Sequence, residues 1–246
     1  MSRYFLEISY KGTAYSGFQS QKNANTIQAE IEKAFEMLQK ERIIMVGSSR
    51  TDSGVHAVQN FFHFDYNENL NPHFVYKMNA ILPADIVIKN VFPVSDKAHC
   101  RFDAISREYN YFIYRSKDPF LRERAFYFPY KLDIDKLQQS AQMLGNYVDF
   151  TAFSKRKTQV KTFNCRVIES EWFWEENILA YRVKANRFLR GMVRALVATM
   201  LKVGRSKMDL EQFKNIIESK DASRANFGVP AHGLFLIKVE YPPEIL

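Results

Sequence analysis

The order of strand-like and helix-like segments is the feature that most limits the fold of this chain. Alternating apolar residues predict a strand at 3–10, and a helix capped by Asn25 or Thr26 follows. Two strands, one on each side of a loop of small residues at 47–57, complete this first set of elements. A second round comprises a strand at 107–114, a helix capped by Asp133 or Asp135, a hairpin at 165–173 and 178–185, helices at 187–203 and from about 209, and a strand at 233–241. The pattern predicts an α+β fold of two strand–helix–strand–strand halves, joined near residue 105, with a ligand cleft between them.

Size and cysteine content narrow the class of protein further. A chain of 246 residues allows one large domain or two small ones with a common core. Cys100 and Cys165 lie far apart without a CxxC or CxxH neighbour, so they indicate neither a metal site nor a disulfide framework. The first residues form no signal-peptide pattern, and the longest apolar runs are too short to span a bilayer. We therefore expect a cytoplasmic protein with no membrane partner.

Charge is distributed unevenly along the chain. Residues 1–106 carry 11 basic and 11 acidic side chains, whereas residues 107–246 carry 24 and 16, which accounts for the whole net charge of +8. Residues 150–168 and 177–208 contain no acidic side chain. Such segregation predicts a polyanionic partner, and the 21 Phe and 13 Tyr residues favour RNA with unstacked bases. The alternative is a solvated cationic face without a partner. The cations that we expect to contact RNA are Lys155, Arg156, Arg187 and Arg190.

A loop of small residues carries the first candidate for catalysis. Residues 47–57 read GSSRTDSGVHA and lie between two apolar runs, so Arg50 and Asp52 sit on a loop between strands. Functional side chains often lie on loops that a rigid sheet holds. The alternative is that Asp52 only hydrogen-bonds its own turn.

The helix expected at 187–203 carries the second candidate. Arg187, Arg190 and Arg194 fall at i, i+3 and i+7, which places them on one stripe. Three interpretations stay open: the arginines contact phosphates, they extend along a packed surface, or one of them holds a buried carboxylate in its ionised form.

Seven ordered segments together resemble the tRNA pseudouridine synthase A family, and the likeness spans nearly the whole chain. The loop sequence RTDSGVHA resembles the signature RTDxGVHA of that family. The opening segment YKGTAYSGFQ resembles its YDGTxYxGWQ element. The other matching segments are NAILP at 79–83, AHCRF at 98–102, REYNY at 107–111, NRFLRGMVR at 186–194 and PAHGLFL at 230–236.

This resemblance implies a reaction, a partner and an assembly. The family converts uridine to pseudouridine in the anticodon stem-loop of tRNA, at positions 38, 39 and 40. The N1–C1′ bond breaks, the uracil turns, and C5 forms the new bond, a redox-neutral isomerisation that needs no cofactor or metal. The resemblance further implies a homodimer whose subunits both touch one tRNA. It also implies two α+β halves, residues 1–105 with the catalytic loop and 106–246 with the basic tRNA-binding surface, that share a mainly antiparallel sheet.

The family motifs also imply roles for single residues. Asp52 matches the catalytic aspartate, which forms a covalent adduct or stabilises the developing oxocarbenium charge. Tyr109 matches a tyrosine that stacks on the target uracil, although a tyrosine on a sheet face is the ordinary alternative. Arg194 matches the arginine that pairs with the aspartate, and Arg50 matches the one that helps to extrude the nucleotide. His56 belongs to the same motif, and we interpret it as structural.

Three departures from the family pattern bear on which uridines are modified. Ser49 replaces a glycine, so the loop must be reshaped if that position needs a positive φ. Phe18 replaces a tryptophan. Gly191 stands where a bulkier residue is common, and inside a helix it would cost about 1 kcal/mol relative to alanine.

Two other classes of function compete with an isomerase. A non-catalytic RNA-binding protein could use the same basic surface, although the presence of Asp52 and Tyr109 argues against it. A carboxylate hydrolase normally needs two placed carboxylates, and the nearest acid along the chain after Asp52 is Asp65.

Overall fold

The computed structural model describes residues 1–155 and 160–245, and these divide into two compact units. Unit 1 comprises Met1–Ile105 together with Phe235–Leu246, and unit 2 comprises Ser106–Leu234. Both units combine helices with mainly antiparallel strands, which confirms the predicted α+β class. Residues 235–246, which the sequence assigned to the second half, group with unit 1, where β9 pairs parallel with β3. The predicted division into domains stays a prediction. The sharing of one sheet and the cleft between the halves stay predictions.

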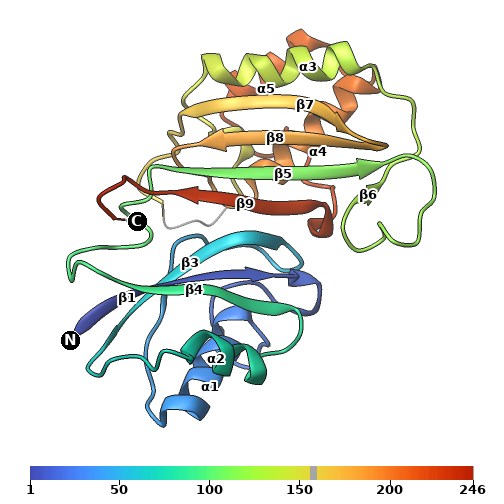
Figure 1. The fold of residues 1–246 in the computed structure, drawn as a ribbon. Helices are drawn as coiled ribbons and strands as arrows, with labels where there is room; N and C mark the ends of the chain where they lie inside the picture. The colour runs from blue at the N-terminus through green and yellow to red at the C-terminus, as the bar shows by residue number, and fades with distance from the viewer. Residues whose placement is uncertain (156–159, 246) are drawn as a thin grey trace. The chain divides into compact units, whose positions relative to one another are not determined.

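Unit 1 is a sheet with two helices on one face (Figure 1). Strand β1 pairs antiparallel with β3 and β4, β2 pairs with β3, and β9 lies parallel to β3. The core is aromatic, and the ring of Phe35 meets those of Phe64, Tyr66 and Phe74 edge-on. The elements are β1 (Ser2–Tyr10), η1 (Gly12–Ala14), α1 (Ile27–Gln39), β2 (Val46–Gly47), β3 (His56–Tyr66), α2 (Phe74–Ile81), β4 (Ile86–Val94) and β9 (Leu234–Glu240).

Helix α1 shows how local sequence signals fix an element of unit 1. The Thr26 side chain accepts a hydrogen bond from the Ala29 amide, which confirms one of the two predicted caps. Ile31 and Phe35 recur at helical spacing and are fully buried. The helix ends where Lys40 adopts the left-handed conformation, with φ of 61°.

Unit 2 also packs helices against a sheet. Strand β8 pairs antiparallel with β5 and β7, and the short β6 lies parallel to β5. Helices α3, α4 and α5 pack together, and α3 lies against β7 (Figure 1). Asp133 and Asp209 cap α3 and α5. The elements are β5 (Ser106–Tyr114), β6 (Phe126–Tyr127), α3 (Ile134–Met143), η2 (Leu144–Asn146), η3 (Thr151–Phe153), β7 (Val167–Glu175), β8 (Ile178–Ala185), α4 (Met192–Gly204), α5 (Leu210–Ser219) and η4 (Ala231–Gly233).

The predicted start of the helix at residue 187 is wrong. Helix α4 begins at Met192, because Gly191 precedes it with φ of 74°, a left-handed conformation that an α-helix cannot continue through. Arg187 and Arg190 therefore lie outside the helix, and only Arg194 lies on it, so the predicted stripe of three arginines does not exist. Glycine is favourable at this boundary, and the expected helix-interior cost does not apply.

Other boundaries also differ from the sequence pattern. The apolar run at 43–46 contributes only Val46 to a strand, because β2 consists of two residues beside β3. Helix α2 and strand β4 were not predicted. Within the ranges that the structure describes, no helix is long and apolar enough to cross a membrane.

Candidate catalytic loop and RNA-contacting residues

The Asp52 loop, residues 48–55, is held by one buried side chain of β3. Asn60 is fully buried, and its Oδ1 accepts a hydrogen bond from the Ser48 hydroxyl at 2.9 Å. Its Nδ2 donates to the Ser49 carbonyl oxygen at 3.1 Å and to the Tyr10 hydroxyl at 3.3 Å. A buried amide that is paired on both sides tolerates little displacement of its partners. Asn60 thus fixes the first residues of the loop to the sheet.

The N-terminal motif, residues 10–19, forms the other support of the loop. The Tyr10 hydroxyl lies 2.8 Å from the Thr51 hydroxyl, and the Phe18 amide donates to the Thr51 carbonyl at 3.1 Å. The Gly12 amide donates to Nδ1 of His56 at 3.1 Å. A Cβ atom at Gly12 would collide with the carbonyl oxygen of Val55, so the close approach of these two segments requires glycine.

Asp52 itself lies at the start of a tight turn. The Val55 amide donates to the Asp52 carbonyl oxygen at 3.2 Å, and Gly54 has φ of 79°, as a type II turn requires. The Asp52 residue is half-buried and Arg50 is exposed. The loop therefore presents a cation and an anion, two residues apart, on a backbone fixed from both sides.

Ser49 does not strain the loop. The non-glycine residues with positive φ in the described ranges are Asn23, Lys40, Glu176, Ser206 and Lys220, and Ser49 is not among them. The residue is buried and its hydroxyl lies 3.5 Å from that of Ser48. Because Ser49 does not have a positive φ, serine at this position does not force the loop into another shape.

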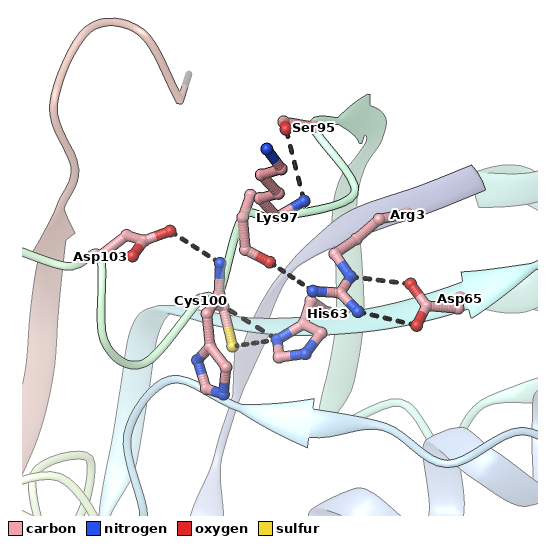
Figure 2. A network of polar contacts seen from close by, with 9 residues as sticks. Arg3, His63, Asp65, Ser95, Lys97, Cys100 and Asp103 are labelled. Atoms are coloured by element: carbon pink, nitrogen blue, oxygen red, sulfur yellow. Dashed lines mark hydrogen bonds and ion pairs between the residues drawn. The ribbon is translucent and has the colours of Figure 1, made fainter. Parts of the chain in front are cut away.

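The segment 98–103 of unit 1 carries a polar network around a buried histidine, which Figure 2 shows from close by. Nδ1 of His63 lies 3.2 Å from the Cys100 sulfur and accepts a hydrogen bond from the Cys100 amide at 3.3 Å. The Arg3 guanidinium contacts both carboxylate oxygens of Asp65 and also donates to the Ala98 carbonyl. Burial lowers the pKa of His63 to about 4, with a smaller contribution from His99. This network fixes the segment beside β3 with a neutral imidazole.

In unit 2, two of the matching segments, 107–111 and 186–194, contact each other. The Tyr109 side chain is buried and its ring meets that of Phe188 edge-on, with centroids 5.0 Å apart. Nη1 of Arg107 donates to the Asn186 carbonyl at 3.3 Å. Two residues of β5 thus hold the segment 186–190, which leads into α4.

The segment 229–230 is held from two sides. Nε and Nη2 of Arg194 both donate to the Val229 carbonyl oxygen, at 3.0 and 2.7 Å. The Tyr111 hydroxyl donates to the Pro230 carbonyl at 2.8 Å. Burial raises the pKa of Tyr111 well above its usual range, and the charge of Arg194 opposes that effect. Arg194 and Tyr111 are therefore near neighbours.

Three of the basic residues that we expected to contact RNA lie in described segments of unit 2: Arg187 and Arg190 precede α4, and Lys155 follows η3. The Lys155 amide donates to the Arg190 carbonyl at 2.9 Å, and the Lys155 side chain covers Gly191, where an added Cβ would lie 3.0 Å from its Cγ. Arg187 lies near Cys165 and lowers the pKa of that thiol, although burial raises it to about 11 overall. Arg156 lies outside the described residues.

The structure thus brings together Arg50 and Asp52 in unit 1, Tyr109 with the 186–190 segment, and Lys155 with Arg190 in unit 2. Sequence reasoning missed Asn60 and Tyr111 as positioning residues. A polar residue inside the apolar run of β3 was the signal that could have identified Asn60. Among residues 1–155 and 160–245, no group of three or more His, Cys, Asp or Glu residues is placed to hold a metal ion.

Comparison with known proteins gives one consistent result. The model of the family described as tRNA pseudouridine synthase matches residues 8–103 and 141–242. A protein of Parabacteroides distasonis named tRNA pseudouridine synthase A is 42% identical over 247 residues, covering 100% of this chain and 98% of that protein. Proteins of the same name from Porphyromonas gingivalis and Staphylococcus aureus are 41% and 38% identical, covering 100% and 96% of this chain and 99% and 90% of their own.

Proposed function

Because this chain belongs to the tRNA pseudouridine synthase family, it is an isomerase of uridine in tRNA, and we propose that it acts on the anticodon stem-loop with Asp52 as its catalytic carboxylate. The observation that carries the proposal is the Asp52 loop, which Asn60, Tyr10 and Phe18 hold from two sides through the Ser49 carbonyl and the Thr51 hydroxyl and carbonyl. A catalytic group gains most when its backbone is fixed before the substrate arrives.

The reaction needs few groups from the protein. As the N1–C1′ bond breaks, positive charge develops at C1′, and the Asp52 carboxylate stabilises it or bonds to the reacting substrate. The uracil turns, and C5 forms the new bond to C1′. C5 then loses its proton to a base, and N1 takes up a proton, so that the product has the same composition as the uridine. Each turnover therefore releases the hydrogen of C5.

Three more residues complete the proposed site. Tyr109 stacks on the target uracil, and the edge contact with Phe188 keeps its ring plane fixed. Arg194 pairs with Asp52, while its two donors to Val229 hold the guanidinium in place. Arg50, which is exposed, helps to extrude the nucleotide, a step that costs a few kcal/mol in lost stacking.

The proposal extends to the setting in which the enzyme works. Lys155, Arg187 and Arg190 contact tRNA phosphates, with Arg156 as a fourth cation from the sequence alone. The enzyme acts in the cytoplasm as a homodimer and uses neither a cofactor nor a metal, as the resemblance implies. The targets are positions 38, 39 and 40.

The test is release of tritium from tRNA that carries uridine tritiated at C5. We expect the wild-type protein to release tritium and Asp52→Asn to release at least about 1,000-fold less, while both bind tRNA equally. Asp96→Asn, which changes an exposed carboxylate of the same unit, is the matched control and should keep full activity. Mapping of the modified nucleotides then tests the anticodon assignment.

Two outcomes would contradict the proposal. Equal release by Asp52→Asn and wild type would place the chemistry on another residue. Tight, salt-sensitive binding of tRNA without any release by the wild type would favour the non-catalytic RNA-binding alternative.

A further inference from the structure

A second cationic surface of unit 2 lies at the end of α4. We call it the Arg205 patch and define it by its aromatic and basic residues. Arg205 follows the last residue of α4, and its guanidinium carbon lies 3.7 Å from the centroid of the Tyr130 ring and 5.9 Å from that of Phe128. The members of the patch are Phe128, Tyr130, Lys131, Lys202, Arg205 and Lys207.

The aromatic part of the patch is a fixed platform. The rings of Phe128 and Tyr130 meet edge-on with centroids 5.0 Å apart, and the Phe128 amide donates to the Tyr114 carbonyl of β5 at 2.9 Å. Tyr130 nevertheless exposes 47% of its surface. An exposed tyrosine that a strand and a second ring hold in place can support another planar group at little entropic cost.

The guanidinium on this platform has its donors available. Within the ranges that the structure describes, the Arg205 side chain makes no hydrogen bond and no ion pair, and its guanidinium lies over the two rings. A guanidinium that contacts the face of an aromatic ring does so without using its N–H groups in hydrogen bonds to other residues. Those donors form a planar fork that matches two oxygens of a phosphate.

The charges around Arg205 favour an anion. Lys131, Lys202 and Lys207 are exposed and form no ion pair in the described part of the chain, and the Lys207 amide donates to the Lys202 carbonyl at 2.9 Å. The two acidic residues nearest to the patch along the chain have other partners. Asp133 caps α3 and pairs with Lys136, and Asp209 caps α5, so among the described residues neither forms an ion pair with a cation of the patch.

We infer that the Arg205 patch is a phosphate-binding surface for the backbone of the tRNA substrate, with Arg205 as its central contact and Tyr130 as its support. RNA fits this surface better than an acidic protein segment, because the patch offers both separated cations for successive phosphates and an exposed ring for an unstacked base. This inference rests on the proposed function for the identity of the RNA. The patch binds substrate and takes no part in bond breaking.

The test measures tRNA binding by fluorescence anisotropy at several salt concentrations, beside the tritium-release assay. We expect Arg205→Gln to raise the Kd about 3- to 10-fold and to reduce the slope of log K against log salt by about 1, with release at saturating tRNA unchanged. Arg205→Lys, which keeps the charge but loses the planar fork, should fall between that variant and wild type. Arg42→Gln removes an exposed arginine that pairs with Glu36, and it should change nothing.

A second variant tests the same surface in case Arg205→Gln does not fold. Tyr130→Leu removes the platform and leaves the cation, so it should weaken binding about 2- to 3-fold without changing the salt slope. Unchanged Kd and slope in folded Arg205→Gln, checked by thermal melting, would overturn the inference even if the enzyme isomerises tRNA normally. The two proposals can also fail separately. If Arg205→Gln loses affinity for tRNA but the wild type releases no tritium, the Arg205 patch is supported as an RNA-binding surface and the proposed function is refuted.

Discussion

The two units differ in charge although both combine a sheet with packed helices. Unit 1 contains 12 basic and 13 acidic residues, a net charge of −1, whereas unit 2 contains 23 and 14, a net charge of +9. The proposed catalytic carboxylate belongs to the nearly neutral unit, and the cations expected to meet RNA belong mainly to the other. Affinity for a polyanion requires many cations, whereas a reacting carboxylate adds a negative charge that would repel that partner. In this chain the proposed carboxylate and most of the cations belong to different units.

The units also hold their functional residues differently. In unit 1, neutral side chains such as Asn60 and Tyr10 fix the backbone of the Asp52 loop. In unit 2, cationic side chains bind main-chain carbonyls, as Arg194 does at Val229 and Arg107 at Asn186. Changes to the residues that support the Asp52 loop should therefore alter the reaction rate and stability. Changes to the exposed cations of unit 2, as distinct from Tyr109 and Arg194, should alter mainly the binding of tRNA.

Among changes outside the proposed catalytic residues, the largest effect is expected from Gly12→Ala in unit 1. The new methyl group would collide with the Val55 carbonyl, so the N-terminal motif and the Asp52 loop must separate. We expect the free energy of unfolding to fall by about 3 kcal/mol and kcat to fall at least about 100-fold. Urea unfolding and tritium release measure both. Gly145→Ala in unit 2 is the control, because nothing lies within 4 Å of the added atom, and equal losses in the two variants would refute this account.

Asn60→Ala is expected to have the next largest effect. It leaves the buried Ser48 hydroxyl and Ser49 carbonyl without their partner, which should lower the free energy of unfolding by about 2 kcal/mol. The rate of tritium release should fall, and the salt dependence of tRNA binding should not. The comparison variant is Asn90→Ala, at an exposed position of β4. If Asn60→Ala changed the slope of log K for tRNA binding against log salt, the assignment of tRNA binding mainly to unit 2 would be wrong.

Acid should act on unit 1 through His63. The folded-state pKa of about 4 lies below the ordinary value of 6.5, so folding favours the neutral imidazole. This stability is complete above pH 6.5 and is lost as the pH falls from 6.5 through 4. We expect the melting temperature to drop by several degrees over that range, and to drop less in His63→Leu. Arg3, Asp65, His99 and Asp103 also act on the pKa of His63 through their charges. Because salt screens such interactions, the buffers must have the same ionic strength at every pH. A pH profile identical in both proteins would rule out His63 as the source.

The smallest effect is expected from Gly191→Ala in unit 2. Alanine at φ of 74° costs about 1 kcal/mol, and its Cβ would press on the Lys155 side chain. We expect KM for tRNA to rise about 2- to 3-fold with kcat unchanged, as steady-state kinetics would show. A fall in kcat at constant KM would instead indicate a role of this position in the reaction, and the assignment of binding to unit 2 would need revision.

Local signals were enough to predict much of the fold. The caps at Thr26, Asp133 and Asp209 are side chains that bind the amide three residues further on. Such residues mark a helix start in the sequence to within one or two positions, so the first two caps were among the predicted pairs and the third lies where a helix start was expected. The helix expected from residue 187 was wrong because Phe188 continues the apolar stripe of α4, and only the backbone conformation of Gly191 separates the two. Periodicity cannot reveal a positive φ.

The candidate site was less accessible to sequence reasoning. The family motifs pointed to Asp52, Tyr109 and Arg194, and their roles stay predictions. The contacts that hold the site join residues that are far apart along the chain, such as Tyr10 with Thr51, Tyr111 with Pro230 and Arg194 with Val229. No spacing rule connects such pairs, because they depend on the register of strands and on loop closure.

Strand β9 has a consequence for the order in which the protein matures on the ribosome. Residues 56 and 57 of β3 pair in parallel with residues 235 and 236, although about 180 positions separate them. Unit 2 is continuous in sequence, whereas unit 1 lacks one of its strands until the last part of the chain has been translated. Nascent chains usually fold from the N-terminus onward. Here unit 2 can fold before unit 1 is complete. Strand β9 is the last strand to be translated, and it pairs with the first residues of β3, directly after the Asp52 loop. The loop therefore gains this part of its support only near the end of synthesis.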